Sequence, residues 1–206
     1  MQRDRAKTLR LPFLAAVLPL LAACSGQYTP VSFTAAGDQI VASGTIDHTT
    51  LSAFEEIMDE NPGAKTLVLQ NIEGSVDDDS NVVFSRVVRE EGFDTVVPSN
   101  GLVASGGTDL FLAGNRRLLE PGACVGVHSW GGGGYVAADL PDGHPEHDRY
   151  LDYFEDIGVN PDFYWFTLDA APEDEMHWMT SAEANRYDMT TRAATRLGAA
   201  AICDER

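Results

Sequence analysis

Two hydrophobic periodicities alternate along the chain from residue 40 onward. Apolar residues that alternate or run together predict strands, and apolar residues three or four positions apart predict amphipathic helices. The predicted strands are residues 40–46, 66–69, 95–98 and 123–128, with a further extended segment over 99–103. The predicted helices are residues 51–60, 82–89, 109–113 and 148–157. Strands that alternate with helices favour an α/β fold, in which a mainly parallel sheet is covered by helices.

The first 23 residues have the pattern of a secretory signal. A basic start is followed by an apolar stretch over residues 11–22 that is too short to span a bilayer, and then by Leu-Ala-Ala-Cys. This ending resembles the lipobox of bacterial lipoproteins, in which the cysteine, here Cys24, is lipidated. We expect an extracytoplasmic protein held on the periplasmic or cell-surface side of a membrane by acyl chains. A plain secretory signal is the alternative.

About 180 residues follow this signal, which is the length of one domain. We expect a lipidated cysteine and tether over residues 24–37 and a single α/β domain over 38–206.

Acidic residues dominate the composition. The chain has 14 Lys and Arg against 32 Asp and Glu. Residues 1–23 hold four of the basic residues and one acidic residue, so the chain without them carries a net charge of −21. A surface of this charge repels phosphate backbones, so we expect no nucleic-acid partner.

A glycine-rich turn carries the first candidate chemistry. Ser105 lies between the extended segment and the helix predicted over 109–113, and it is followed by Gly106 and Gly107. Glycines allow a sharp turn and a close approach of substrate to the main chain. The helix would direct free N–H groups at the position beside Ser105, where they would stabilise a developing oxyanion. The alternative is a serine that only caps the helix.

Three candidate pieces follow three predicted strands: residues 71–75, Ser105 and His128. The carboxyl ends of parallel strands meet at one edge of a sheet, where ligands gather. We therefore expect these pieces to lie close together.

Four segments carry a family resemblance: LVLQNIEGSV, ASGGTDLFLAGNRR, PGACVGVHSW and MTSAEANRYDM. In order and spacing they resemble the Clp-type serine protease fold of the crotonase superfamily, and the secreted single-domain Clp-like proteins of bacteria in particular. The resemblance spans about residues 38–190. It implies Ser105 as the nucleophile, His128 as the general base, and the N–H groups of Gly74 and Gly106 as the oxyanion hole. It further implies a peptide or protein substrate, no metal or other cofactor, and a homo-oligomer.

The chain departs from this family at two places. Ile72 and Glu73 replace a proline and a glycine of the oxyanion loop, and Met176 stands where the third triad member is expected. Glu175 is our candidate for that third member, with Asp174 as the second choice, and a Ser–His dyad stays open. The alternative functions are a catalytically inactive binding or scaffold lipoprotein that keeps the fold, and an acyl-thioester enzyme of the crotonase type.

Cys124 and Cys203 remain once Cys24 is lipidated. An oxidising compartment favours a disulfide between them, and two buried free thiols are the alternative, because a sequence does not supply the separation of the two Cα atoms.

Other motifs have plainer interpretations. Gly131–Gly134 predict a flexible loop beside His128 that could serve as a lid. His144 and His147 are separated by Pro145 among acidic residues, which favours a solvated loop over a metal site. Residues 77–79 are expected to cap the following helix, with a cation site as the alternative. The aromatic run over 163–166 predicts core or subunit packing.

Overall fold

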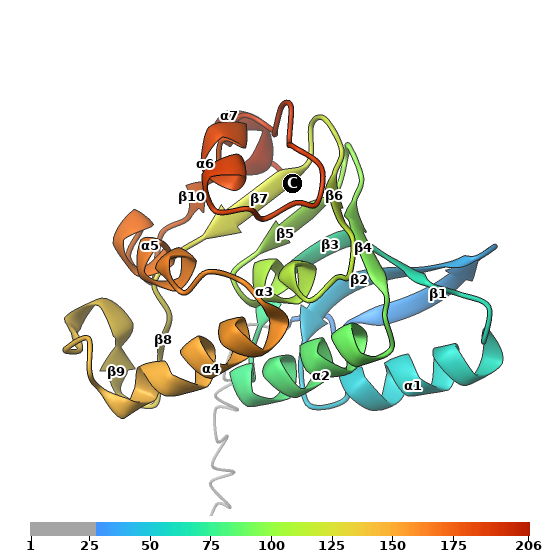
Figure 1. The fold of residues 1–206 in the computed structure, drawn as a ribbon, viewed down its shortest axis with the longest axis horizontal. Coiled ribbons are helices and arrows are strands. Elements are labelled where there is room, and N and C mark those ends of the chain that lie inside the picture. The colour runs from blue at the N-terminus through green and yellow to red at the C-terminus, as the bar shows by residue number, and fades with distance from the viewer. Residues whose placement is uncertain (1–27) are drawn as a thin grey trace, which may run out of the picture.

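The computed structural model describes residues 28–206, so the signal and Cys24 lie outside the described residues. Within this range eight strands form one sheet (Figure 1). They are β1 (Ser32–Ala36), β2 (Gln39–Ile46), β3 (Thr66–Ser75), β4 (Asp94–Val97), β5 (Leu102–Ala104), β6 (Arg117–Leu119), β7 (Cys124–Val127) and β10 (His177–Trp178). A separate hairpin is formed by β8 (Gly131–Gly132) and β9 (Tyr135–Val136).

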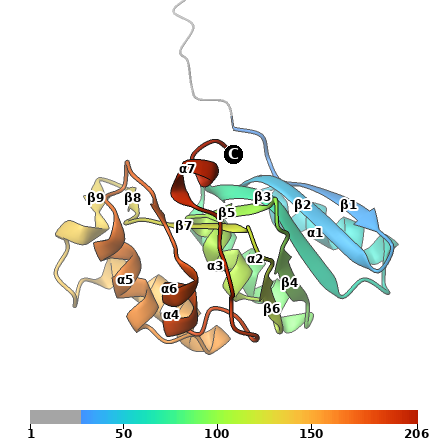
Figure 2. The ribbon, with the colours of Figure 1, turned by 90° about the horizontal axis from the view of Figure 1, so that it is seen from above.

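The helices are α1 (Thr50–Glu60), α2 (Asp78–Glu90), α3 (Gly106–Leu112), α4 (Asp148–Ile157), α5 (Asp162–Ala170), α6 (Ser181–Arg186) and α7 (Ala200–Cys203). Two short 3-10 helices, Ala137–Asp139 and Pro145–His147, precede α4. Figure 2 shows α2 and α3 on one side of the sheet and α7 on the other. Within residues 28–206, no helix is both long and apolar enough to cross a membrane.

The interior of the sheet is parallel, and its two antiparallel pairings are those of β1 with β2 and of β10 with β7. β3 is long enough to pair with two strands on the same side. Its first half pairs with β4, and its second half pairs with β5 through Asn71 and Ile72. The carboxyl ends of β3, β5 and β7 consequently lie side by side, as expected from the alternation of strands and helices. The predicted α/β class, with a mainly parallel sheet covered by helices, is confirmed.

The folded domain begins earlier than the sequence analysis placed it. Residues 32–36, assigned to the tether, form β1 and pair with β2 from Ser32 opposite Ser43 to Ala36 opposite Gln39. The strand was missed because all but one of its residues are exposed, which leaves little hydrophobic alternation to detect.

Two helices also begin earlier than predicted. α2 starts at Asp78, because Asp77 accepts a hydrogen bond from the Ser80 N–H at 3.2 Å and acts as the N-cap. The expected capping by residues 77–79 is therefore confirmed, while the helix start at Val82 is wrong. α3 starts at Gly106, directly after the serine, and not at Asp109.

A disulfide joins Cys124 of β7 to Cys203 of α7, with the two Cα atoms 5.7 Å apart. Both residues are buried. Of the two alternatives for these cysteines, the structure shows the disulfide, which ties the C-terminal helix to the central sheet.

Candidate active site

Ser105 occupies a sharp turn between β5 and α3. Its φ of 52° and ψ of −128° fall in a region that non-glycine residues rarely adopt. Such a conformation costs on the order of 1–3 kcal/mol and persists only where the surroundings hold it. Here the Gly126 carbonyl accepts hydrogen bonds from the Ser105 N–H at 3.1 Å and from Thr108 Oγ1 at 2.8 Å. The Ser105 side chain makes no capping hydrogen bond, so the simple capping interpretation is wrong.

Close packing explains the glycine that follows the serine. A Cβ at Gly106 would lie 2.5 Å from Ser75 Oγ and 2.8 Å from Asn81 Nδ2. Asn81 is 2% exposed, and its Nδ2 donates a hydrogen bond to the Gly106 carbonyl at 2.9 Å. Asn81 thereby fixes the orientation of the main chain at the start of α3.

Gly74 lies directly beside the serine. A Cβ at Gly74 would be 3.3 Å from Ser105 Cβ and 3.7 Å from Ser105 Oγ, and the φ of Gly74 is 149°. Glu73 points to the opposite side, because neighbouring strand residues face opposite ways. It is exposed and accepts a hydrogen bond from Asn71 Nδ2 at 3.2 Å. Its carboxylate is thus turned away from the position where an oxyanion would form.

His128 follows β7 and is half-buried. Its Nδ1 lies 3.1 Å from the main-chain oxygen of Glu173. In the neutral ring, an Nδ1–H that donates to this carbonyl leaves Nε2 free to accept a proton. Burial lowers the pKa of His128 below its ordinary value, although the Glu173 carbonyl and the charge of Asp78 oppose the shift. The shift favours the neutral imidazole.

Ser105 and His128 line the same small cavity, of about 40 Å³, which holds roughly three water molecules. In the described part of the chain, Ser105 Oγ makes no hydrogen bond to His128. Catalytic hydrogen bonds are often long in unliganded sites and tighten when substrate binds.

The expected third triad member is not at His128. Asp174 and Glu175 are both exposed, and within residues 28–206 neither carboxylate is hydrogen-bonded to the imidazole. The segment turns back on itself through a hydrogen bond from the Glu175 N–H to the Pro172 carbonyl at 3.2 Å, and the acidic side chains face solvent. A main-chain oxygen takes the place where we expected a carboxylate.

Comparison with known proteins gives a likeness of fold. No protein-family model matches the chain, and no curated protein sequence matches it. Among solved structures, a serine-to-alanine variant of the 1510-N membrane-bound stomatin-specific protease matches with a TM-score of 0.50 at 15% identity, over 78% of this chain and 77% of that chain. A Bacillus subtilis protein described as a polyketide biosynthesis enoyl-CoA hydratase matches with a TM-score of 0.51 at 10% identity, over 84% of this chain and 73% of that chain. The chain has a crotonase/Clp-like fold.

A crotonase/Clp-like fold does not by itself choose a reaction, because the same scaffold hosts a protease and a hydratase in these two neighbours. The side chains around Ser105 determine which reaction this chain could catalyse.

Two carboxyl groups that the sequence did not single out for the site, those of Asp78 and Asp109, also line this cavity. Asp109 lies one helical turn after Ser105, so both face the same side of α3. Burial raises the pKa of Asp109 to about 8, and the charge of Asp78 adds to the shift. The detectable signal was an acidic residue four positions after Ser105 and directly before the apolar run Leu110–Ala113.

The two histidines considered for a metal site have a different setting from the one expected. His147 is fully buried rather than solvated, and its Nδ1 lies 2.6 Å from Tyr164 Oη. Tyr164 Oη also accepts a hydrogen bond from Trp130 Nε1 at 2.9 Å. Within residues 28–206, no group of three or more His, Cys, Asp or Glu side chains is placed to hold a metal ion.

The structure also describes the glycine loop, residues 131–134, and the aromatic run, residues 163–166. Gly131 and Gly132 form one strand of the β8–β9 hairpin, so the loop has more structure than predicted. Phe163 and Tyr164 of α5 are buried, which confirms core packing for the aromatic run.

Proposed function

We propose that the chain is a serine hydrolase that cleaves peptide bonds, with Ser105 as the nucleophile and His128 as the general base. The observation that carries the proposal is the strained turn of Ser105 at the wall of a cavity that it shares with a neutral, oriented imidazole. Strain of this kind concentrates at nucleophiles placed between a strand and a helix.

The chemistry follows from the positions of these groups. Ser105 Oγ attacks the carbonyl carbon while His128 Nε2 takes its proton, and the carbonyl π electrons move to oxygen. The N–H groups of Gly74 and Gly106, which border the serine, would hold that oxyanion. His128 then returns the proton to the amine, which leaves as the C–N bond breaks. A water molecule, deprotonated by the same imidazole, releases the acyl group.

The Glu173 carbonyl orients the imidazole but stabilises its protonated form less than a carboxylate would. This difference supports a slow enzyme, and it is also the observation that favours the second candidate function. That candidate is a binding or scaffold protein that keeps the fold without turnover.

The proposal includes the location and the partners of this enzyme. Lipidation of Cys24 would hold the chain on the outer side of a bacterial membrane, in the periplasm or at the cell surface. The disulfide between Cys124 and Cys203 supports an oxidising compartment. Its partners would be a peptide or protein substrate and further copies of the chain in a homo-oligomer, with no nucleic acid among them.

Labelling with a fluorophosphonate probe tests the proposal, because the probe reacts with activated serines. The full-length chain, Ser105→Ala and His128→Ala should be compared between pH 6 and pH 9. Exposed Ser99 and His48 offer matched controls as Ser99→Ala and His48→Ala.

We expect labelling of the wild type and both controls, and none of Ser105→Ala or His128→Ala. A folded wild-type chain that stays unlabelled would instead support the binding protein.

A further inference from the structure

The cavity that Ser105 lines is acidic and aromatic. Asp109 comes from α3, Asp78 from the start of α2, and Tyr150 from α4, and all three line the cavity with Ser105. Asp78 Oδ2 accepts a hydrogen bond from Tyr150 Oη at 2.6 Å, which fixes that carboxylate against the ring. The Asp109 carboxyl group makes no hydrogen bond or ion pair within residues 28–206.

A wider hollow of about 330 Å³ adjoins this cavity and shares Asp78, Trp130 and Tyr150 with it. Its lining adds the carboxylates of Asp77, Asp79 and Glu146 but a single cation, Arg149. The two adjoining hollows together are referred to as the groove. Its charge is strongly negative, even for this acidic chain.

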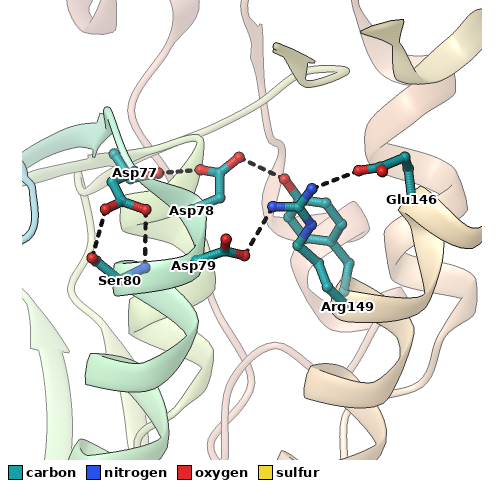
Figure 3. A network of polar contacts seen from close by, with 8 residues as sticks. Asp77, Asp78, Asp79, Ser80, Glu146 and Arg149 are labelled. Carbon is teal, nitrogen blue, oxygen red and sulfur yellow. Dashed lines mark hydrogen bonds and ion pairs between the residues drawn. The ribbon is translucent and has the colours of Figure 1, made fainter. Parts of the chain in front are cut away.

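The chain already places a cation of its own in this groove. Arg149 lies 3.0 Å from Asp79 and 2.7 Å from Glu146, and its guanidinium sits 5.5 Å from the centre of the Tyr150 ring (Figure 3). Carboxylates on either side and an aromatic face below are the environment that a desolvated cation prefers. The same environment continues inward toward Asp109, where no cation of the described chain reaches.

We propose that the cavity beside Ser105 selects substrates with a cationic side chain, lysine in particular, and that Asp109 and Asp78 are its specificity-determining residues. This inference rests on the proposed function. The lysine ammonium would lie between the two carboxyl groups, and the peptide would follow the groove past Tyr150.

Size favours lysine over a bulkier cation. The inner cavity of about 40 Å³ has room for roughly three water molecules. The Cδ, Cε and Nζ atoms at the end of a lysine side chain would fill a similar space. A guanidinium group has more heavy atoms than an ammonium group and needs more of this volume. The wider outer hollow, in contrast, is where the guanidinium of Arg149 is found.

Charge favours lysine over neutral and acidic side chains. The raised pKa of Asp109 favours its neutral form when no cation is near. An arriving ammonium would displace the proton of Asp109 to solvent and leave two carboxylates around one cation. A norleucine side chain, which lacks only the amino group of lysine, would bury these polar groups without a partner. A glutamate side chain would be repelled by Asp78.

Peptidyl diphenyl phosphonates test the specificity, because they react with activated serines and carry a chosen side chain next to the reactive phosphorus. Three such probes with lysine, norleucine and glutamate would be compared on the full-length chain by their second-order labelling rates. We expect the lysine probe to react at least about tenfold faster than norleucine, since a site built for a polar group rejects the analogue that lacks it. Glutamate should react slowest.

Asp109→Asn keeps the shape of the side chain and removes its charge. We expect it to bring the ratio of lysine to norleucine rates close to one, whereas Asp59→Asn, an exposed substitution on α1, should leave that ratio unchanged. The wild-type comparison stands even if Asp109→Asn fails to fold.

The outcomes separate the two proposals. Equal or faster labelling by norleucine in the wild type overturns the lysine specificity and leaves the hydrolase intact. If the folded chain reacts with none of these probes and with no general fluorophosphonate, both the lysine specificity and the hydrolase proposal are overturned.

Discussion

His128 Nδ1 lies 3.1 Å from the main-chain oxygen of Glu173, and in the proposed mechanism this contact stands in place of the carboxylate of a triad. A carbonyl fixes the ring and its tautomer, as the third member of a triad does. It carries no full charge, so it offers less stabilisation to the imidazolium that forms during attack. The orientation of the His128 ring therefore depends on the backbone conformation around Glu173.

The first prediction concerns the acidic side chains near this contact. Because Asp174 and Glu175 face solvent, Asp174→Ala and Glu175→Ala should each change the labelling rate by less than about threefold, against about 10⁴ for loss of the working carboxylate of a triad. Rates of fluorophosphonate labelling measure this directly. A drop of two orders of magnitude in Glu175→Ala would show that its carboxylate reaches His128 during the reaction.

A second prediction concerns Asn81, a positioning residue. Its Nδ2 holds the Gly106 carbonyl at 2.9 Å, and the Gly106 N–H is a proposed oxyanion donor. We expect Asn81→Ala to lower kcat by roughly 10–100-fold, below the loss from deleting a donor itself, with little change in KM.

Ser85→Ala is the matched control for Asn81→Ala. Ser85 Oγ donates to Asn81 Oδ1 at 3.3 Å, so its removal leaves the bond to Gly106 in place. Steady-state kinetics on a lysine peptide amide give kcat and KM separately for both variants. A rise in KM with kcat unchanged would contradict the positioning role.

The third prediction is the pH dependence of activity. Burial lowers the pKa of His128 below its ordinary 6.5, and in the proposed mechanism the neutral ring is the base. The kcat for a lysine peptide amide should therefore rise with pH through a midpoint below 6.5 and stay level above it, because the bound lysine has already displaced the Asp109 proton. The profile of kcat between pH 4.5 and pH 8 measures the midpoint, and a midpoint above 7 would mean that a nearby charge outweighs the burial.

Fourth, the disulfide should contribute to stability. The link between Cys124 and Cys203 joins positions 79 residues apart, and closing such a loop restricts the unfolded chain. We expect the Cys124→Ala, Cys203→Ala double variant to lose about 2–4 kcal/mol in free energy of unfolding. Urea denaturation measures this free energy. Wild type with and without reductant gives a second comparison in which the sequence is unchanged. Identical midpoints with and without reductant would contradict the link.

Much of the fold was readable from hydrophobic periodicity. The strands at residues 40–46, 66–69 and 95–98 and the helix over 148–157 are present, because their apolar faces must be buried. The meeting of Gly74, Ser105 and His128 follows from the same order of elements, since parallel strands end at one edge.

Other features left no pattern to detect. The acceptor for His128 is a backbone carbonyl, and every residue has one, so no residue type marks it. Strand β1 is exposed along most of its length and shows little alternation. The pairing of the two cysteines depends on a distance between elements that only the tertiary structure sets. Asp109 was assigned to a helix, but its direction toward the serine depends on α3 starting at Gly106.

The central claim is that Ser105 is an activated nucleophile, and the site of a covalent adduct tests it most directly. Full-length chain treated with a fluorophosphonate would be weighed intact and then digested for peptide mapping by mass spectrometry. We expect one adduct per chain, located on Ser105, and no adduct in His128→Ala. An adduct on another serine, or none on a folded chain, would contradict it.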